Sequence, residues 1–223
     1  MAMAQMLKRI IPPPIKNTVK SLLQQLRRFF FNSNSYWEQR YQAGGNSGIG
    51  SYGKLAQYKA DVLNSFVQRQ GITTVIEFGC GDGHQLAYYQ FSDYIGLDVS
   101  KTAIAACQEK FHQDHRKKFL LYNKGLQDLE PADLTLSIDV LFHLVEDRVF
   151  KSYLQDLFSY SEKYVIIYST NFDRIYDSPH QIDRKFTDYI GQEITNFTLE
   201  EIISNPHKGK DTMSDFYVYV RVV

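Results

Sequence analysis

The stretch VIEFGCGDGHQL, residues 75–86, decides the fold. An apolar run ends in Glu77 and Phe78, and a glycine-rich turn follows it. The glycines occupy alternate positions, Gly79, Gly81 and Gly83. An apolar run that leads into such a turn predicts a buried strand whose end cradles a nucleotide. A dinucleotide site favours G-x-G-x-x-G, because its third glycine lets the next helix pack closely. That third position is His84 here, so the turn is not typical of a pyrophosphate site.

Strands and helices alternate on both sides of this turn. The expected strands are residues 73–78, 94–99, 118–122, 133–138, 163–169, 197–203 and 215–223. The expected helices are residues 54–70, 83–90, 101–113, 146–160 and 180–191. This alternation predicts an α/β fold with a Rossmann-like, doubly wound, mostly parallel seven-stranded sheet. No helix separates the last two strands, so we expect them to form a hairpin with an antiparallel C-terminal strand.

Composition restricts the class of protein. The chain has 223 residues, of which 43% are hydrophobic, enough for one well-buried core. Its 25 basic and 25 acidic residues balance, which argues against a nucleic-acid partner. Two cysteines, Cys80 and Cys107, indicate buried free thiols rather than a disulfide framework or a metal site. No apolar run is long enough to span a membrane, so a cytoplasmic location is expected.

The N-terminal segment, residues 1–34, is basic and contains no acidic residue. After three prolines at residues 12–14, apolar residues recur at helical spacing from Val19 to Phe30 among basic ones. One interpretation is an amphipathic helix that contacts a membrane surface or a partner protein. The other is a helix packed on its own domain. We expect a helical extension over residues 1–34 and one domain over residues 35–223.

Two acidic residues indicate what the glycine turn binds. Asp98 ends the second expected strand, where a carboxylate accepts hydrogen bonds from both hydroxyls of a ribose. Glu77 ends the first strand, where a carboxylate suits an ammonium group better than a pyrophosphate. The ligand should therefore carry a ribose, an amino group and no diphosphate. S-adenosylmethionine (SAM) has these features.

Three segments resemble conserved motifs of the class I SAM-dependent methyltransferases. VIEFGCGDG resembles their first motif, GLDVS their second, and DLTLSIDVLFHLVED the segment that follows their fourth strand. The resemblance extends over residues 73–170. It implies these contacts to SAM: Glu77 near the ammonium, Gly79, Cys80, Gly81 and Gly83 around the methionyl part, Asp98 on the ribose, and Val99 beside the adenine. A backbone contact to the adenine edge is expected from Leu126 or Gln127.

Methyl transfer to a hydroxyl requires a general base. His143 follows the fourth strand and is largely neutral at pH 7, which makes it the first candidate; otherwise it packs beside the cofactor or caps the next helix. His180, in SPHQIDRKFTDYI, is the second candidate, unless this segment is simply a solvated helix start with a surface ion pair. Asp139 is expected to orient the methionyl tail, to bind the acceptor or to hold a neighbouring side chain. No short metal-binding motif is present, so no metal is expected.

A front loop, residues 35–55, precedes the core helix. Its aromatic residues Tyr36, Trp37 and Tyr41 would cover the SAM site, and its glycines would permit lid movement. Arg40 would pair with the SAM carboxylate or with an anion of the substrate. The alternative is an ordinary mobile loop. Together with P-H-x-x-x-R-x-F-T-D, this loop resembles a bacterial subgroup of small class I methyltransferases associated with glycan genes.

These observations favour a SAM-dependent methyltransferase that acts on a small-molecule or glycan acceptor, at a hydroxyl oxygen. The main alternative is a catalytically silent SAM-binding or SAH-binding scaffold (SAH is S-adenosylhomocysteine) or a regulatory module. A nucleic-acid acceptor is disfavoured, because the core has no basic stripe and the N-P-P-[YF] motif of amino-methylating enzymes is absent.

Overall fold

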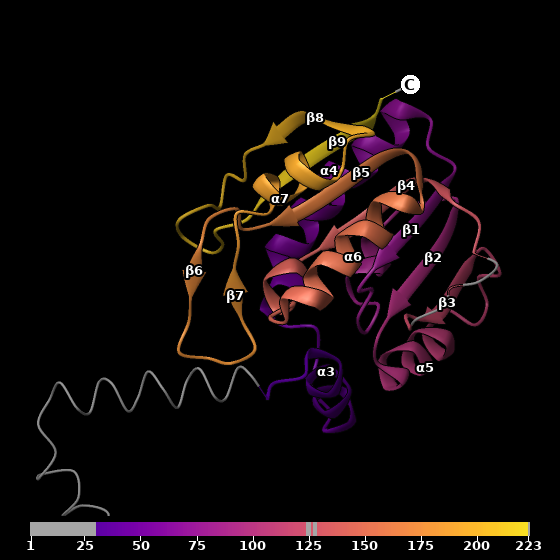
Figure 1. The fold of residues 1–223 in the computed structure, drawn as a ribbon. Coiled ribbons are helices and arrows are strands. Elements are labelled where there is room, and N and C mark those ends of the chain that lie inside the picture. Colours follow the sequence, from indigo (N-terminus) through magenta and orange to yellow (C-terminus); the bar gives the residue numbers. More distant parts are fainter. Residues whose placement is uncertain (1–29, 124–125, 127–128, 223) are drawn as a thin grey trace, which may run out of the picture.

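A seven-stranded sheet forms the centre of the protein in a computed structural model, which describes residues 30–123, 126 and 129–222 (Figure 1). The strand order is β3-β2-β1-β4-β5-β9-β8. The strands are β1 Thr74–Phe78, β2 Asp93–Asp98, β3 Lys117–Leu121, β4 Ala132–Ile138, β5 Ser161–Ser169, β8 Phe197–Ile203 and β9 Asp215–Arg221. Strands β1 to β5 pair in parallel, whereas β9 runs antiparallel to both β5 and β8. The expected doubly wound sheet with an antiparallel C-terminal strand is confirmed.

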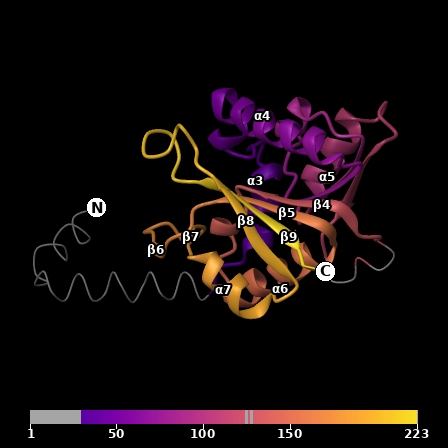
Figure 2. The same cartoon turned by 90° about the horizontal axis from the view of Figure 1, so that it is seen from above.

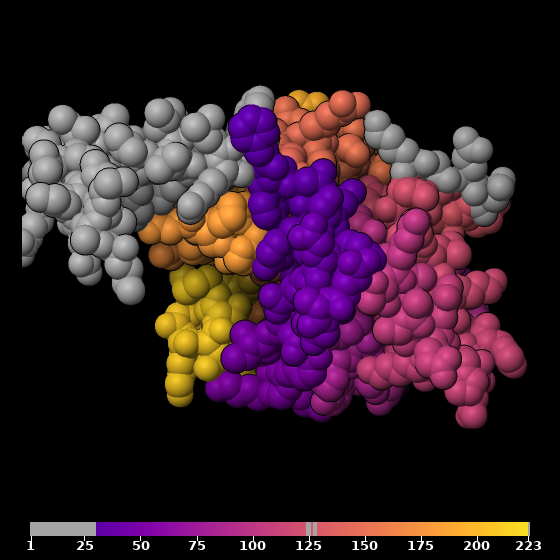
Figure 3. Space-filling view, turned by 90° about the horizontal axis from the view of Figure 1, so that it is seen from below, coloured from indigo at the N-terminus to yellow at the C-terminus, as the bar shows by residue number. Residues whose placement is uncertain are grey.

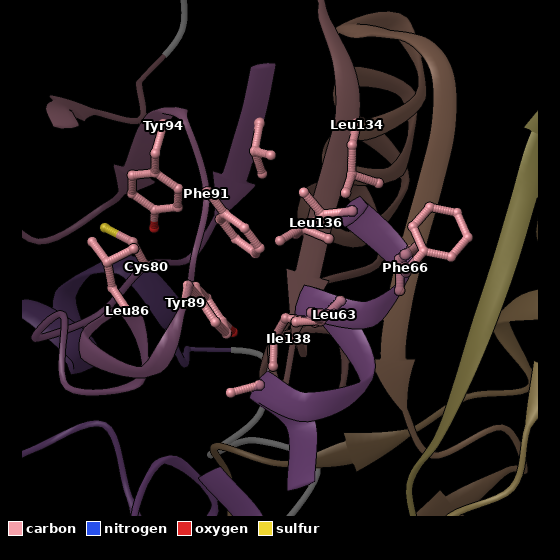
Figure 4. Packing of buried hydrophobic residues seen from close by; sticks show 14 of the residues in the cluster. Leu63, Phe66, Cys80, Leu86, Tyr89, Phe91, Tyr94, Leu134, Leu136 and Ile138 are labelled. Atoms are coloured by element: carbon pink, nitrogen blue, oxygen red, sulfur yellow. The ribbon is translucent and has the colours of Figure 1, made fainter. Parts of the chain in front are cut away.

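Helices cover both faces of the sheet (Figure 2). Helices α4, Gly53–Gln70, and α5, Lys101–Lys110, lie on one face, and α6, Asp147–Ser159, and α7, Phe186–Glu193, lie on the other. Every residue of β4 is buried, as expected for a central parallel strand between two helical layers. Figure 4 shows Leu63 and Phe66 of α4 beside Leu134 and Leu136 of β4 in one of the two core clusters.

Two expected helices differ in the structure. Residues 83–90 contain only a short 3-10 turn, η2, Gln85–Tyr88. The helix expected over residues 180–191 begins at Phe186, because the preceding residues form a small hairpin of β6, Arg174–Ile175, and β7, Ile182–Asp183. The buried Asp183 carboxylate accepts hydrogen bonds from the hydroxyls of Thr170 and Tyr176, which holds this segment extended. Side-chain anchoring of this kind overrides local helix propensity.

Helix α3, Ser33–Gln42, crosses the carboxyl edge of the parallel strands. Figure 3 shows α3 and the loop after it, in indigo, over this edge of the molecule. The helix begins two residues before the expected domain start, and its N-cap Asn32 accepts a hydrogen bond from the Ser35 amide. Most of the expected N-terminal extension lies outside the described residues. Among the helices that the structure describes, none is long and apolar enough to cross a membrane.

Candidate functional site

A cavity of about 380 Å³ lies at the carboxyl ends of β1, β2 and β4, beneath α3 and the front loop. Ligands bind at this edge in open α/β sheets. The cavity brings together ten residues that the sequence predicts: Trp37, Tyr41, Glu77, Gly79, Cys80, Gly81, Asp98, Val99, Asp139 and His143. Four other predicted residues do not line it: Arg40, Gly83, Leu126 and His180.

Glu77 is a buried carboxyl group at the end of β1, with 4% of its surface exposed. The Tyr94 hydroxyl donates a hydrogen bond of 2.6 Å to Glu77 Oε2. Burial raises the pKa of Glu77 to about 7, although the Tyr94 hydrogen bond and the charge of Lys59 act in the opposite direction. Glu77 therefore titrates near neutral pH, and a bound cation would favour its ionised form.

Asp98, the last residue of β2, is held against the glycine turn. Its Oδ2 accepts a hydrogen bond of 2.9 Å from the Gly81 amide, and its Oδ1 accepts one of 2.9 Å from the Ser100 amide. Burial raises the pKa of Asp98 to about 6, and these backbone hydrogen bonds oppose the rise. The carboxylate thus faces the cavity in a fixed orientation, with lone pairs left for hydroxyl donors.

The glycine turn requires glycine for two physical reasons. Gly79 and Gly81 have φ values of 86° and 56°, in the left-handed region. A Cβ on Gly81 would also lie 2.3 Å from Ser47 Oγ, and a Cβ on Gly79 would lie 2.5 Å from Val140 Cγ2. Gly83 has another role, because a Cβ there would lie 2.9 Å from both Cys107 Sγ and the Phe111 ring. Gly83 permits close packing of α5 rather than forming the cavity wall.

The front loop is closed over this turn by Asp82. The Ser47 amide and the Tyr52 hydroxyl each donate a hydrogen bond of 3.0 Å to Asp82 Oδ2. In return, the Asp82 amide donates one of 3.0 Å to Ser47 Oγ, which also lies 3.0 Å from the Tyr41 hydroxyl. We refer to this arrangement of Tyr41, Ser47, Tyr52 and Asp82 as the loop clasp. The sequence pattern does not single out Asp82, since an aspartate between glycines is equally typical of an ordinary turn.

Helix α3 is anchored to the start of α5 by Glu38. Its carboxylate accepts hydrogen bonds from the hydroxyls of Ser100, at 2.7 Å, and Thr102, at 2.8 Å. The Ser100 and Thr102 hydrogen bonds lower the pKa of Glu38 to about 2. A carboxylate near a helix N-terminus is also favoured by the helix dipole. Glu38 therefore positions the aromatic face of α3 over the cavity.

Arg40 and Leu126 do not have the surroundings that the sequence analysis expected. Arg40 Nε donates a hydrogen bond of 2.7 Å to the Asn46 carbonyl, and its guanidinium carbon lies 5.5 Å from the Trp37 ring centroid. Leu126 packs on the core at the α6 face, and its carbonyl accepts a hydrogen bond from Tyr160. Tyr122 and Asn123 line the cavity after β3 instead. The other candidate there, residue 127, lies outside the described residues.

His143 lies in the short turn after β4, and its environment defines its protonation state. Its Nδ1 is 3.1 Å from the carbonyl oxygen of His180. Because a carbonyl only accepts hydrogen bonds, Nδ1 carries the proton and Nε2 has a free lone pair. Burial lowers the pKa of His143 to about 4, so the ring is neutral at pH 7. The Trp37 ring packs edge-on against it at 4.9 Å.

His180 supports His143 through its backbone and lies outside the cavity lining. Its ring stacks on Tyr36 with centroids 4.8 Å apart, and its Nδ1 lies 2.5 Å from Ser178 Oγ. Arg184, from the same segment, donates hydrogen bonds to the carbonyls of Leu144 and Val145. The polar cluster of residues 180–185 thus braces the turn that carries His143.

Asp139 lines the cavity and pairs with a lysine that the sequence analysis missed. Its φ is 59°, the one positive value found for a non-glycine residue in the described part of the chain. Lys59 Nζ lies 2.6 Å from Asp139 Oδ2, and the lysine is fully buried. A signal was present in the sequence, because Lys59 lies on the same face of α4 as the core residues Leu55 and Leu63.

The donors and acceptors around the cavity fit an adenosyl cation. Glu77, Asp98 and Asp139 supply carboxylates, which match an ammonium group and ribose hydroxyls and would repel a pyrophosphate. In the described ranges, no group of three or more His, Cys, Asp or Glu side chains is arranged to hold a metal ion.

Comparisons with known proteins agree with this description. The model of a family described as a methyltransferase domain matches residues 76–160. The N-methyltransferase NodS from Bradyrhizobium japonicum WM9, in complex with SAH, is similar in structure, with a TM-score of 0.66 and 11% identity over 86% of this chain and 100% of that one. Magnesium protoporphyrin IX methyltransferase from Synechocystis PCC 6803, with bound SAH, has a TM-score of 0.62 and 15% identity over 89% and 99%.

A third similar structure is a SAM-dependent methyltransferase from Clostridium acetobutylicum ATCC 824, with a TM-score of 0.58 and 12% identity over 74% of this chain and 91% of that one. A search of curated protein sequences finds no match to this chain. At these identities the structural likeness establishes the fold, a Rossmann-like fold shared with methyltransferases, and leaves the acceptor undetermined.

Proposed function

We propose that this chain is a class I SAM-dependent methyltransferase and that it transfers the methyl group to a hydroxyl oxygen of a small-molecule or glycan acceptor. SAM supplies a methyl group on a positively charged sulfur, which already makes the carbon electrophilic. The protein must therefore align the acceptor and remove its proton. A hydroxyl has a high pKa, so this proton removal separates an O-methyltransferase from enzymes that act on more acidic groups.

The observation that carries the proposal is the state of His143. The His180 carbonyl accepts a hydrogen bond from the Nδ1–H group of His143. Burial keeps the ring neutral, so Nε2 is available as a base. The residue also lines the cavity, next to Trp37. In the proposed step, the acceptor oxygen forms the new bond to carbon while its proton moves to His143 Nε2. The resulting imidazolium returns the proton to water after product release.

The remaining cavity residues would bind and orient SAM. Asp98 would accept hydrogen bonds from the ribose hydroxyls, Val99 would border the adenine, and Gly79 to Gly81 would contact the methionyl part. Glu77 would face the ammonium group. Trp37 and Tyr41 would exclude water from the reacting atoms, since both line the cavity beneath the front loop.

The acceptor class rests on chemistry rather than on the comparisons. The solved relatives include an N-methyltransferase and a porphyrin methyltransferase, so the fold serves different acceptors. A neutral, fixed histidine favours a hydroxyl acceptor, because an amine nucleophile needs no base once it is deprotonated.

We further propose that the protein acts in the cytoplasm, where the buried Cys80 and Cys107 stay reduced. Residues 1–34 would provide any contact with a membrane surface or a partner.

A methyl-transfer assay on a panel of hydroxyl compounds tests the proposal. The panel should contain sugars, nucleotide sugars and phenols, with amines of matched size as controls. His143→Gln, which keeps a polar side chain of similar length, should lower kcat by about 10²- to 10⁴-fold with SAH affinity unchanged. Full activity of this variant would exclude His143 as the base. Tight SAH binding without transfer to any acceptor would favour a silent scaffold.

A further inference from the structure

The three most exposed large apolar side chains in the described part of the chain come from segments that border the cavity. Ile49 is 88% exposed, Phe30 is 77% exposed and Ile175 is 74% exposed, whereas no other such side chain exceeds 52%. Phe30 lies shortly before α3, Ile49 begins the short turn η1, Ile49–Ser51, of the front loop, and Ile175 belongs to the β6–β7 hairpin. We refer to these three residues as the apolar rim. Scattered apolar residues are normal on a surface, but a group of them at one edge indicates an interaction site.

Direct contacts join these segments to one another and to the cavity. The Tyr36 ring of α3 stacks on the His180 ring of the hairpin segment, with centroids 4.8 Å apart. In the front loop, a Cβ on Gly50, next to Ile49, would lie 2.9 Å from Oδ2 of Asp139, which lines the cavity. Figure 3 shows α3 and the front loop, in indigo, beside the hairpin, in orange. The apolar rim therefore lies at the same edge of the sheet as the cavity.

The charge of the chain changes sign at the apolar rim. Residues 1–29 contain six basic residues and no acidic residue, which leaves 19 basic and 25 acidic residues for the rest of the chain. This basic segment joins the domain at Phe30, a member of the rim, and its sequence carries apolar residues at helical spacing from Val19 onward. A purely apolar partner would not use the basic residues, and a purely anionic partner would not use the rim. The surface therefore fits a partner that offers anionic groups next to an apolar layer.

A bilayer that contains anionic lipids offers both kinds of contact. Apolar side chains enter the boundary between headgroups and acyl chains, and Lys and Arg are attracted to the anionic headgroups. We propose that residues 1–29 and the apolar rim dock the protein on an anionic lipid surface, with the edge that carries the cavity facing the membrane. The basic segment is needed because the acidic remainder of the chain would otherwise be repelled by these headgroups. This inference goes beyond methyl transfer and does not depend on the cofactor or on the acceptor.

Sedimentation of the full chain with lipid vesicles, without SAM or acceptor, tests the docking. The protein should bind vesicles of equal parts phosphatidylglycerol and phosphatidylcholine, and should bind vesicles of phosphatidylcholine alone much more weakly. About 0.5 M salt should weaken the first interaction several-fold, because it screens the basic residues. The double variant Ile49→Glu/Ile175→Glu should bind about tenfold more weakly, since it adds two negative charges and removes two apolar contacts at the membrane. Leu120→Glu/Leu199→Glu, which places the same charges at exposed positions of the edge strands β3 and β8, is the matched control.

The comparison of the variants decides the outcome. If Ile49→Glu/Ile175→Glu binds anionic vesicles as tightly as the control variant, the apolar rim takes no part and the proposal fails. Equal binding of the wild-type protein to both kinds of vesicle, or binding to neither, also overturns it, and the second result would favour a protein partner for residues 1–29.

Thermal unfolding shows whether each variant folds. If the rim variant does not fold, hydrogen exchange of the wild-type protein on anionic vesicles carries the test. Exchange over residues 43–53 and 174–182 should then slow, and unchanged exchange in these segments would overturn the docking. Because no methyl transfer is measured, failure of these experiments leaves the proposed function untouched.

Discussion

At the scale of residues, the carboxyl groups of Glu77 and Asp98 contribute negative charge to the cavity when they are ionised. Glu77 and Asp98 are both buried, and burial raises their pKa values to about 7 and about 6. A ligand that brings positive charge and hydroxyl donors would reverse the cost of ionising them. The ligand-free cavity is therefore electrostatically unfavourable by itself, as expected for a site in which stability is sacrificed for binding.

The raised pKa of Glu77 predicts opposite pH dependences for folding and binding. Between its ordinary pKa, 4.5, and about 7, the folded ligand-free protein binds more protons than the unfolded chain, so Glu77 makes the free energy of unfolding fall as pH rises through this range. SAH affinity should rise over pH 6 to 8, because the ionised carboxylate attracts the ammonium. Thermal unfolding with and without SAH at each pH measures both trends.

Glu77→Gln supplies the control for this pH dependence. The substitution keeps the size of the side chain and removes the titration, so the SAH-induced rise in Tm should lose most of its pH dependence above pH 6.

His143 makes a different contribution to the pH dependence. Since burial lowers the pKa of His143 to about 4, its ring stays neutral from pH 6 to 8 and should not change kcat there. A kcat that falls steeply below pH 7 would contradict this assignment.

At the scale of elements, the cavity is closed by two contacts between the N-terminal part of the domain and the sheet edge. Glu38 seats α3 on the start of α5, and the loop clasp ties the front loop to the glycine turn. Glycines at positive φ lie before, within and after the clasped segment, namely Gly44, Gly48 and Gly53. A glycine-containing loop that is held to the sheet edge through one acidic side chain, Asp82, is suited to open when those hydrogen bonds are released.

Removal of the clasp should open the front loop. Asp82→Ala deletes the acceptor of the Ser47 amide and the Tyr52 hydroxyl, so amide hydrogen exchange over residues 43–53 should accelerate. SAH should dissociate several-fold faster, since two hydrogen bonds of about 1 kcal/mol each are lost. Exchange mass spectrometry and stopped-flow release measure the two effects. Asp61→Ala, on the exposed face of α4, is the control, and unchanged exchange in Asp82→Ala would contradict the clasp.

At the scale of the molecule, Ser33 connects the start of α3 to the segment that follows β4. Its amide and hydroxyl donate hydrogen bonds to the Glu146 carboxylate, and its hydroxyl also contacts the His143 carbonyl at 3.1 Å. The first residues of α3 therefore form part of the cavity wall beside His143. Ser33, which the sequence analysis assigned to the N-terminal extension, thus contacts the segment after β4.

Two truncations distinguish the N-terminal extension from the domain. Deletion of residues 1–29 should leave SAH affinity and Tm unchanged, because every described residue that lines the cavity lies at or after Ser33. Deletion of residues 1–34 should lower both, since it removes Ser33 and leaves Glu146 without these donors. Calorimetry and thermal unfolding of the two proteins provide the comparison. Equal behaviour of both truncations would show that Ser33 is dispensable.

Local sequence patterns predicted the parts of the protein that depend on neighbours in the chain. The apolar run before Glu77 predicted β1, and the position of Asp98 after it predicted an acidic residue at the end of β2. The absence of a helix between β8 and β9 predicted that these two strands pair in antiparallel orientation. These predictions succeeded because the periodicity of apolar residues, the residue types of turns and the handedness of strand connections depend on residues close together in the sequence. The helix expected over residues 180–191 was partly wrong, because the distant Thr170 and the nearby Tyr176 hold Asp183 extended.

Only the tertiary structure decided which side chains act together. Lys59 and Asp139 are 80 residues apart, and Glu38 and Ser100 are 62 apart, yet each pair forms a direct hydrogen bond. No periodicity encodes such pairs, because they depend on how α4 and α3 lie against the sheet edge. The protonation of His143 likewise follows from a carbonyl 37 residues away. The chain by itself specifies a strand, a glycine bend and two acids; long-range packing determines how they are closed, charged and oriented.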